Sequence, residues 1–418
     1  MRADVSSPED DQKFRGRRSK VLFIAGDFPP TFGGLPDYAA LFTQGLATHG
    51  LNVTVMTTKL KGQEDRSFRQ GVQICRAISD WRLSEISSIL RIIDEMGPGT
   101  IVNLMYGGFA MRRRPLVNFL PILLRILRPN FRVIVTIHEF RTQRSRWRVW
   151  ALPMIMYAHG LIFVDRADRE LLLRWTKLKR PEMECIPIAP NILPVSINKS
   201  NREEWRRRLG IVDKTPIVTF FGGISRQKGF LSLLEAMKDL RRDIVPCCLL
   251  IVGWFDPGYI GNEGHEHEVR EALRDGLSAG WIRFAEGCPP DLVSEHLHAS
   301  DIVVLPFVRG ARSNNGSLLA AIAHGLPVLT TRGVDTPNGF AEEYGVALVP
   351  AGDSMALRKR LMEILMSDQE RSCLGTEALR AAKLVSWDSV ARMAAAFYRS
   401  CGSIRPALDY MVDTPPGR

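Results

Sequence analysis

Short apolar runs rich in valine and isoleucine recur along most of this chain, separated by longer segments with helical periodicity. Runs of this kind, bounded by turn residues and alternating with helices, predict a parallel β-sheet that carries helices on both faces. In the first part of the chain a helix is expected over 37–49, and strands are expected at 20–26, 52–57, 100–105, 132–137, 160–164 and 185–188.

The pattern is interrupted once and then begins again. A stretch rich in proline, asparagine and serine before residue 202 predicts a linker. After it we expect strands at 216–221, 248–253, 282–285, 301–306, 327–331 and 346–349, and helices at 202–209, 230–241, 265–279, 290–298, 317–324 and 387–401.

A chain of 418 residues is long enough for two domains. We therefore predict an α/β protein with two doubly wound domains that face each other across a cleft. The expected bounds are a tail at 1–18, domains at 19–190 and 202–386 joined by the linker 191–201, a helix at 387–402 and a tail at 403–418. Ligands bind such sheets at the carboxyl ends of their strands.

Composition excludes several classes of protein. With 45% hydrophobic and 24% charged residues the chain is ordinary for a globular protein, and it has no apolar run of the ~18 residues that a membrane-spanning helix needs. The polar start does not resemble a secretory signal, and the seven cysteines include no Cys-x-x-Cys pair. We expect a cytoplasmic protein with buried thiols. Its net charge of +11 favours anionic partners.

Three loops, each between an expected strand and an expected helix, are candidate ligand sites. The first contains Gly33 and Gly34, which would let the backbone approach a ligand closely. A plain connection is the alternative there. The second is Phe-Gly-Gly-Ile-Ser-Arg-Gln-Lys-Gly-Phe, whose Arg226 and Lys228 stand at an expected helix start. The helix dipole disfavours cations there, so they suggest a bound phosphate, with a solvated turn as the alternative.

The third loop follows the strand at 301–306 and contains Arg309 and Arg312. It leads through Asn-Asn-Gly-Ser into a short helix of small residues, with Ser317 expected as the cap. Two arginines beside free N–H groups at Gly316 and Ser317 suit a diphosphate. The alternative is surface arginines beside a packed helix.

The histidines give one candidate active-site residue and no candidate metal site. His138 follows an expected buried strand, where active sites form, although a structural histidine is the alternative. His265 and His267 would point apart on a helix with no cysteine near, so we expect a solvated helix start and no metal site.

The segment 111–148 is strongly basic. It holds ten arginines against one acid, Glu139, and so supplies nine of the eleven excess positive charges. Arginines beside tryptophan and leucine are typical of a surface that contacts an anionic membrane. A core helix with solvated charges is the alternative. No motif for nucleic-acid binding is recognisable, and we expect no nucleic-acid partner.

These residues together resemble the family-4 glycosyltransferases of the GT-B fold, over roughly residues 20–400. The resemblance rests on the order and spacing of Phe-Pro-Pro-Thr-Phe-Gly-Gly (28–34), His138, Ile-Pro-Ile-Ala-Pro-Asn-Ile (186–192), Gly222 with Lys228-Gly229, Ala-His-Gly-Leu-Pro-Val (323–328) and the helix at 387–401. It implies two Rossmann-like domains, with the acceptor on the first, the nucleotide-sugar on the second, and the last helix crossing back to the first. It also implies retaining transfer of a hexose without metal or cofactor.

The resemblance assigns roles to the candidates. Lys228 and one or more of Arg226, Arg309 and Arg312, with N–H groups near Gly316 and Ser317, would stabilise the diphosphate leaving group. His138 would orient the sugar, and Gly33 and Gly34 would line the site. The acceptor is expected to be a glycan or a lipid-linked sugar in polysaccharide assembly, at the inner face of the cell membrane.

The chain departs from the family at two places. Where the family has Glu-x7-Glu, this chain has Arg312 and Ala320, and where it has an arginine beside the first glycine of the phosphate loop, this chain has Gly223. The second glutamate normally binds the ribose. Two alternatives therefore stay open: another GT-B enzyme, such as a nucleotide-sugar epimerase, and a scaffold that binds nucleotide or membrane without turnover.

Overall fold

The structure is a computed structural model of the whole chain. It describes residues 19–31, 33–107, 111, 114–176, 181–196, 199–211, 215–242, 246–255 and 264–402. The two expected tails, part of the linker, and Arg112 and Arg113 of the basic segment lie outside these residues. The chain divides into two compact units, Met1–Pro187 with Trp387–Arg418, and Ile188–Ser386.

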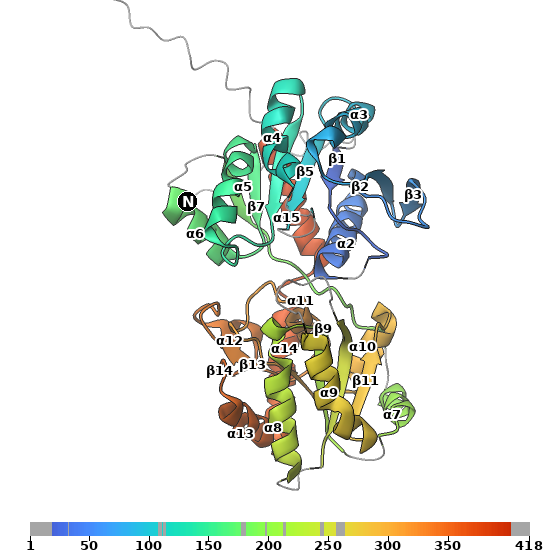
Figure 1. Cartoon of the computed structure of the whole chain (residues 1–418), viewed down its shortest axis with the longest axis vertical. Coiled ribbons are helices and arrows are strands. Elements are labelled where there is room, and N and C mark those ends of the chain that lie inside the picture. The colour runs from blue at the N-terminus through green and yellow to red at the C-terminus, as the bar shows by residue number, and fades with distance from the viewer. Residues whose placement is uncertain are drawn as a thin grey trace, which may run out of the picture. The chain divides into compact units, whose positions relative to one another are not determined.

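Unit 1 is built on an eight-stranded sheet of order β3-β4-β2-β1-β5-β6-β7-β8 (Figure 1). Its strands are β1 (Lys20–Ile24), β2 (Asn52–Thr58), β3 (Arg66–Arg69), β4 (Val72–Ile78), β5 (Ile101–Tyr106), β6 (Arg132–Ile137), β7 (Gly160–Phe163) and β8 (Glu182–Cys185). Its helices are α2 (Gly34–Thr48), the short 3-10 helix η2 (Leu83–Glu85), α3 (Ile86–Met96), α4 (Pro115–Leu127), α5 (Ser145–Tyr157), α6 (Arg166–Thr176) and α15 (Trp387–Gly402).

The last helix, α15, belongs to unit 1 although it follows unit 2 in sequence (Figure 1). It packs on α2, where a Cβ atom at Gly45 would lie 3.0 Å from Cβ of Ala391. Its buried Tyr398 accepts a hydrogen bond at its hydroxyl from Nδ2 of Asn103, whose Oδ1 accepts one from the hydroxyl of Thr136. Helix α15 therefore provides the hydrogen-bond acceptor for the buried amide of Asn103, on β5 in the middle of the sheet.

Unit 2 has a six-stranded, wholly parallel sheet of order β11-β10-β9-β12-β13-β14. Its strands are β9 (Ile217–Ile224), β10 (Cys248–Phe255), β11 (Ile282–Glu286), β12 (Ile302–Leu305), β13 (Val328–Arg332) and β14 (Ala347–Pro350). Its helices are α7 (Lys199–Arg208), the 3-10 helix η3 (Arg226–Lys228), α8 (Phe230–Arg242), α9 (His265–Ser278), α10 (Pro290–Ala299), α11 (Gly316–Ala323), α12 (Phe340–Tyr344), α13 (Ser354–Met366) and α14 (Asp368–Ala382).

Alternation along the buried strands of unit 2 produces two separate cores. Ile217 and Phe221 of β9 join one cluster with α10, α11 and α14, whereas Val218 and Phe220 join another with α8, α9 and α13. Successive side chains of a strand point to opposite faces, so each run of apolar residues fills both cores. The prediction of helices on both faces is confirmed for this unit.

Both sheets share one strand order. Without the added strands at the edges, each reads third, second, first, fourth, fifth, sixth in chain order, which is the order of dinucleotide-binding sheets. The order reverses between β1 and β5 in unit 1, and between β9 and β12 in unit 2. The loops that follow these four strands are therefore where ligands are expected.

Some expected elements differ from those observed. The sequence pattern missed β3 and β4, which pair antiparallel and make one edge of unit 1 a hairpin rather than a crossover. The strand expected at 185–188 lies instead at Glu182–Cys185. β3 and β8 are short edge strands with largely exposed side chains, so their hydrophobic alternation is weak. This does not apply to β4, which is mostly buried inside the sheet.

Candidate functional site

The loops after β9 and β12 lie against each other in unit 2. A Cβ atom at Gly229 would come within 2.0 Å of the carbonyl oxygen of Pro306, and Gly229 has a φ of +67°. Both facts require glycine at this position. The close approach brings η3, which follows β9, beside the loop that leads from β12 to α11.

Lys228 is a half-buried cation at this junction. Its Nζ lies 4.8 Å from the centre of the Phe307 ring. Its ammonium donates no hydrogen bond to any described side chain or carbonyl and has no carboxylate partner among them. Burial, reinforced by the nearby charge of Arg312, lowers the pKa of Lys228 to about 8.

Arg312 and the start of α11 lie near Lys228. The Arg312 guanidinium is half-buried and pairs with no carboxylate among the described residues. The hydroxyl of Ser317 is buried without a hydrogen-bond partner there, and a Cβ atom at Gly222 would lie 3.7 Å from it. Two cations, an unsatisfied hydroxyl and the N–H groups of Gly316 and Ser317 therefore converge at one helix start.

The expected cap of α11 is corrected by the structure. Asn315, not Ser317, occupies the N-cap position, and its Oδ1 accepts a hydrogen bond from the backbone N–H of Arg312. The Ser317 side chain is thereby left for another partner. Asn191, from the stretch 186–192, stands close by: a Cβ atom at Gly316 would lie 3.3 Å from its Oδ1.

Arg226 and Arg309 face carboxylates instead. Arg226 forms an ion pair with Glu268 of α9 at 3.0 Å. Arg309 forms two hydrogen bonds, of 2.7 and 3.0 Å, with the buried carboxylate of Asp335. Of the four expected cations, the structure brings Lys228 and Arg312 together and engages the other two elsewhere.

His138 follows β6 in unit 1, as predicted, and is buried. The Tyr38 ring of α2 packs edge-on against it with centroids 4.3 Å apart, and Trp387 at the start of α15 packs on Tyr38 at 5.5 Å. Burial lowers the pKa of His138 to about 3, so the imidazole is neutral at physiological pH. Tyr38, which packs on His138, and Trp387, which packs on Tyr38, come from segments that the sequence alone did not connect with His138.

Asp168 fixes the backbone that follows His138. This buried carboxylate on α6 accepts hydrogen bonds from the backbone N–H groups of Phe140 and Arg141, at 3.1 and 2.9 Å. Sequence reasoning missed Asp168 because its partners are backbone groups that leave no motif.

The loop with Gly33 and Gly34 follows β1. Gly33, with a φ of +141°, occupies the N-cap of α2, and nothing lies within 4 Å of a Cβ atom built on Gly34. The hydroxyls of Thr57 and Thr58 donate to the carbonyl of Gly26 at the start of this loop. The loop is thus anchored to β2 at one end and opens beside Gly34 at the other.

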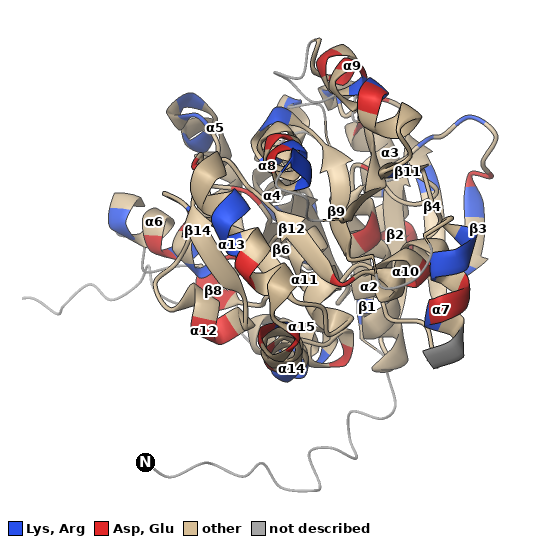
Figure 2. Ribbon diagram, turned by 90° about the horizontal axis from the view of Figure 1, so that it is seen from below, with Lys and Arg blue, Asp and Glu red and all other residues tan. Residues whose placement is uncertain are grey.

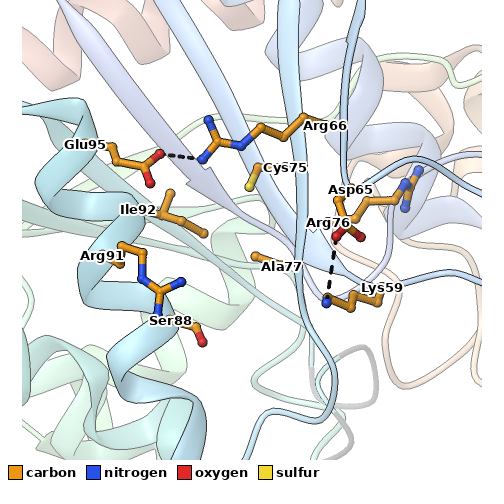
Figure 3. Close-up of a pocket in the computed structure, with 10 residues that line it drawn as sticks. All are labelled: Lys59, Asp65, Arg66, Cys75, Arg76, Ala77, Ser88, Arg91, Ile92 and Glu95. Carbon is orange, nitrogen blue, oxygen red and sulfur yellow. Dashed lines mark hydrogen bonds and ion pairs between the residues drawn. The ribbon is translucent and has the colours of Figure 1, made fainter.

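A separate pocket of about 240 Å³ lies in unit 1 between α3 and the edge of the sheet (Figure 3). Four of its six charged side chains are paired: Arg66 with Glu95 at 2.5 Å, and Lys59 with Asp65 at 3.9 Å. Arg76 and Arg91 also line the pocket, so its charged side chains carry a net charge of +2.

Histidines offer no metal site in the described part of the chain. His265 is buried, not solvated as expected, and its Nδ1 lies 3.3 Å from a carboxylate oxygen of Glu268. No group of three or more His, Cys, Asp or Glu side chains there could hold a metal ion.

Another histidine joins three segments of unit 2. Nδ1 of His324 lies 2.7 Å from the carbonyl oxygen of Ala320, so it donates, and Nε2 accepts from the Ser294 hydroxyl at 2.7 Å. Ser294 in turn accepts from the backbone N–H of Val195. Burial, with the nearby His298, lowers the pKa of His324 to about 4.

Helices α4 and α5 expose apolar side chains beside arginines, and Figure 2 shows Lys and Arg in blue on α5. We call this region the α4–α5 surface: exposed Ile126, Leu127, Arg144, Arg146, Val149, Trp150, Met156 and Tyr157. Other arginines of the basic segment are engaged, such as Arg114 by Asp80 and Arg128 by Asp94. Among the described residues, no helix is long and apolar enough to cross a bilayer.

Comparison with known proteins shows which enzymes this chain is similar to. The model of the group 1 glycosyl transferases matches residues 215–367, which include η3 and α11. A GDP-mannose-dependent alpha-(1-6)-phosphatidylinositol monomannoside mannosyltransferase of Mycolicibacterium smegmatis is 25% identical over 366 residues, 85% of this chain and 91% of that protein. Residues 215–367 therefore resemble the group 1 glycosyltransferases, and the chain is a nucleotide-sugar-dependent glycosyltransferase. The enzymes that it resembles are of the retaining, family-4 group.

Other similarities agree. A D-inositol 3-phosphate glycosyltransferase of Corynebacterium urealyticum is 32% identical over 203 residues, 47% of this chain and 46% of that protein. Sucrose-phosphate synthase of Thermosynechococcus elongatus superposes with a TM-score of 0.72 at 20% identity, over 92% of this chain and 99% of that one. The lipopolysaccharide glycosyltransferase WaaG gives 0.63 at 16%, over 90% and 99%. These superpositions confirm the expected GT-B fold.

Proposed function

We propose that Lys228 and Arg312, with Ser317 and the N–H groups at the start of α11, bind the diphosphate of the nucleotide-sugar donor. The observation that carries this proposal is a pair of neighbouring cations without a carboxylate among the described residues. Burying a positive charge without a counter-charge is costly, so an anion is needed to offset it. The diphosphate provides that charge at a helix N-terminus.

Lys228, Arg312 and the N–H groups at the start of α11 would also stabilise the transition state. As the bond from the sugar to the diphosphate breaks, negative charge grows on the leaving oxygen, and fixed donors stabilise it in the transition state. Arg226 and Arg309, which sequence reasoning also assigned to the diphosphate, would first have to leave Glu268 and Asp335. We therefore give the leading roles to Lys228 and Arg312.

His138 is proposed to orient the transferred sugar. A pKa of about 3 makes this imidazole a poor base and keeps it uncharged, which suits a hydrogen bond to a sugar hydroxyl. Gly34, with open space beside it, would line the acceptor side of the site.

The acceptor is proposed to be a lipid-linked glycan or a phosphoinositide at the cytoplasmic face of the membrane. Support comes from the α4–α5 surface, where arginines flank exposed apolar side chains, and from the relative that acts on a phosphatidylinositol mannoside. Arg144→Glu with Arg146→Glu should abolish binding to anionic vesicles at low salt. Arg242→Glu, an exposed site in unit 2, is the control. Equal binding by all three proteins would refute the membrane contact.

The donor site is tested by nucleotide-induced thermal stabilisation. UDP, GDP, ADP and dTDP are compared on the full chain, and one of them at 100 times its dissociation constant should add about 2.7 kcal/mol to stability. Lys228→Ala and Arg312→Ala should lose most of this gain. The matched control Arg274→Ala, an exposed arginine of α9, should keep it. If no nucleotide stabilises the chain, the proposed donor site is wrong.

A further inference from the structure

Unit 1 also contains a buried cation without a counter-charge. Arg76 of β4 is only 4% exposed. It forms no ion pair among the described residues, and one hydrogen bond is recorded for its guanidinium, from Nη2 to the carbonyl oxygen of Pro29. A guanidinium has five N–H donors, so most of its capacity is unused.

The acids close to Arg76 in the fold are directed elsewhere. Asp65 accepts the backbone N–H of Arg76 at its carbonyl oxygen, but its carboxylate faces Lys59. Glu95 is paired with Arg66. Figure 3 shows both pairs, and the Arg76 side chain extends away from α3. Cys75, next to it on β4, points to the opposite face and joins the core under α3.

Holding the loop after β1 does not require a charge. The hydroxyls of Thr57 and Thr58 already bind the carbonyl of Gly26, and Nε1 of Trp81 donates to the Thr58 hydroxyl. A neutral side chain could hold the Pro29 carbonyl in the same way. The positive charge of Arg76 therefore needs another explanation, since burying it costs free energy.

We propose that Arg76 binds a phosphate group of the acceptor beside the loop that contains Gly33 and Gly34. This inference rests on the proposed function, because it places the acceptor on unit 1. Arginine presents a planar fork of donors that matches two oxygens of a phosphate. The phosphate belongs either to a lipid headgroup or to a soluble sugar phosphate. Lys228 is comparable: it is a half-buried cation without a counter-charge among the described residues, at the carboxyl edge of the other sheet.

The primary test uses inorganic phosphate as the probe. The donor site is first saturated with the nucleotide that stabilises the chain, so that phosphate cannot occupy it. Phosphate is then titrated into the full chain and followed by ³¹P NMR. Arg76→Gln should weaken binding at least ten-fold and Arg76→Lys should weaken it less. Arg66→Gln, which removes an exposed cation of the neighbouring strand, should not change it.

Two further arms separate the sources of the phosphate. Glycerol 3-phosphate tests a soluble phosphomonoester, and phosphatidylcholine vesicles with or without phosphatidylinositol test a headgroup, at a salt concentration that suppresses binding through the α4–α5 surface. A loss in Arg76→Gln with either probe supports the proposal and names the source. Unchanged phosphate binding by Arg76→Gln would overturn it.

Folding and the donor site are checked separately. Nucleotide stabilisation of Arg76→Gln should match that of the unaltered chain, which shows that unit 2 is intact. If Arg76→Gln does not fold, Arg76→Lys keeps the charge and still reports on the geometry. A chain that binds phosphate through Arg76 but no nucleotide would refute the donor site alone.

Discussion

The two units share a strand order but differ in the side chains gathered after their strands. In unit 2 the reversal gathers Lys228, Arg312 and a helix start, all electropositive. In unit 1, Tyr38 of α2, His138 after β6 and Trp387 of α15 lie together, and all three are aromatic and uncharged at neutral pH. Topology therefore decides where a ligand binds, whereas the loop residues decide what is bound.

The largest expected effect is on kcat/KM and comes from removing the positive charge of Lys228 in unit 2. Lys228→Ala should lower kcat/KM at least 100-fold, because the loss of one preorganised donor to a leaving oxygen costs about 2.7–4 kcal/mol. Arg309→Ala should cost less, since Asp335 already engages that guanidinium. Steady-state kinetics on the two variants make the measurement. A greater loss in Arg309→Ala would reverse the proposed roles.

The next effect concerns how each unit is held together. Unit 1 depends on α15, so Gly160→Ala should destabilise it: the new Cβ atom would lie 2.7 Å from Sγ of Cys401. Overpacking of this kind costs about 1–3 kcal/mol. Gly62→Ala, at a glycine with open space around it, controls for the loss of glycine. Urea unfolding should show a clearly larger loss of stability in Gly160→Ala than in Gly62→Ala. A small loss is expected in Gly62→Ala because Gly62 has a φ of +81°.

Acid should destabilise both units through histidines that are buried in the neutral form. The folded pKa values of the buried His138 and His324 are lowered to about 3 and 4. His159, between α5 and β7, is half-buried and accepts the backbone N–H of Val133 at Nδ1, and its pKa is lowered to about 4. The unfolded chain therefore binds more protons below pH ~6.5, and stability falls as the pH drops from there towards 4, by about 1.4 kcal/mol per pH unit for each histidine.

Single substitutions assign this acid sensitivity to one unit or the other. His324→Gln should flatten the pH dependence of unit 2, and His159→Gln that of unit 1, when stability is measured by denaturant titration at pH 7 and pH 5. Identical slopes in the variants and the unaltered chain would contradict a histidine origin for the acid sensitivity.

The smallest expected effect is on the pH dependence of donor affinity in unit 2. Donor affinity should fall as the pH rises past about 8, where Lys228 loses its proton. Arg312→Gln removes a neighbouring positive charge, so the pKa of Lys228 should rise and the fall should move to higher pH. Nucleotide titrations between pH 7 and pH 10 test this. An unchanged pH profile in Arg312→Gln would mean that the two side chains do not interact.

The sequence predicted all six strands of unit 2 and most strands of unit 1, because these buried strands combine β-branched residues with flanking turns, as in 132–137 and 248–253. It missed β4, which is also mostly buried. It predicted the loops that bear Lys228 and Arg312 because they follow buried strands. It did not predict which arginines are neutralised: the pairs Arg226–Glu268 and Arg309–Asp335 join residues 42 and 26 positions apart, which no local pattern connects. Arg76 was missed for a related reason, since burial of a charged side chain is a property of the folded sheet.

The return of α15 to unit 1 has a consequence for synthesis. Asn103 and Tyr398, which bond to each other, are 295 positions apart in the chain. At about 5–20 residues per second, a ribosome needs roughly 15–60 s to add that length. Unit 1 is therefore synthesised first but completed last. The side-chain amide of Asn103 has no Tyr398 hydroxyl to bond to until all of unit 2 has been synthesised.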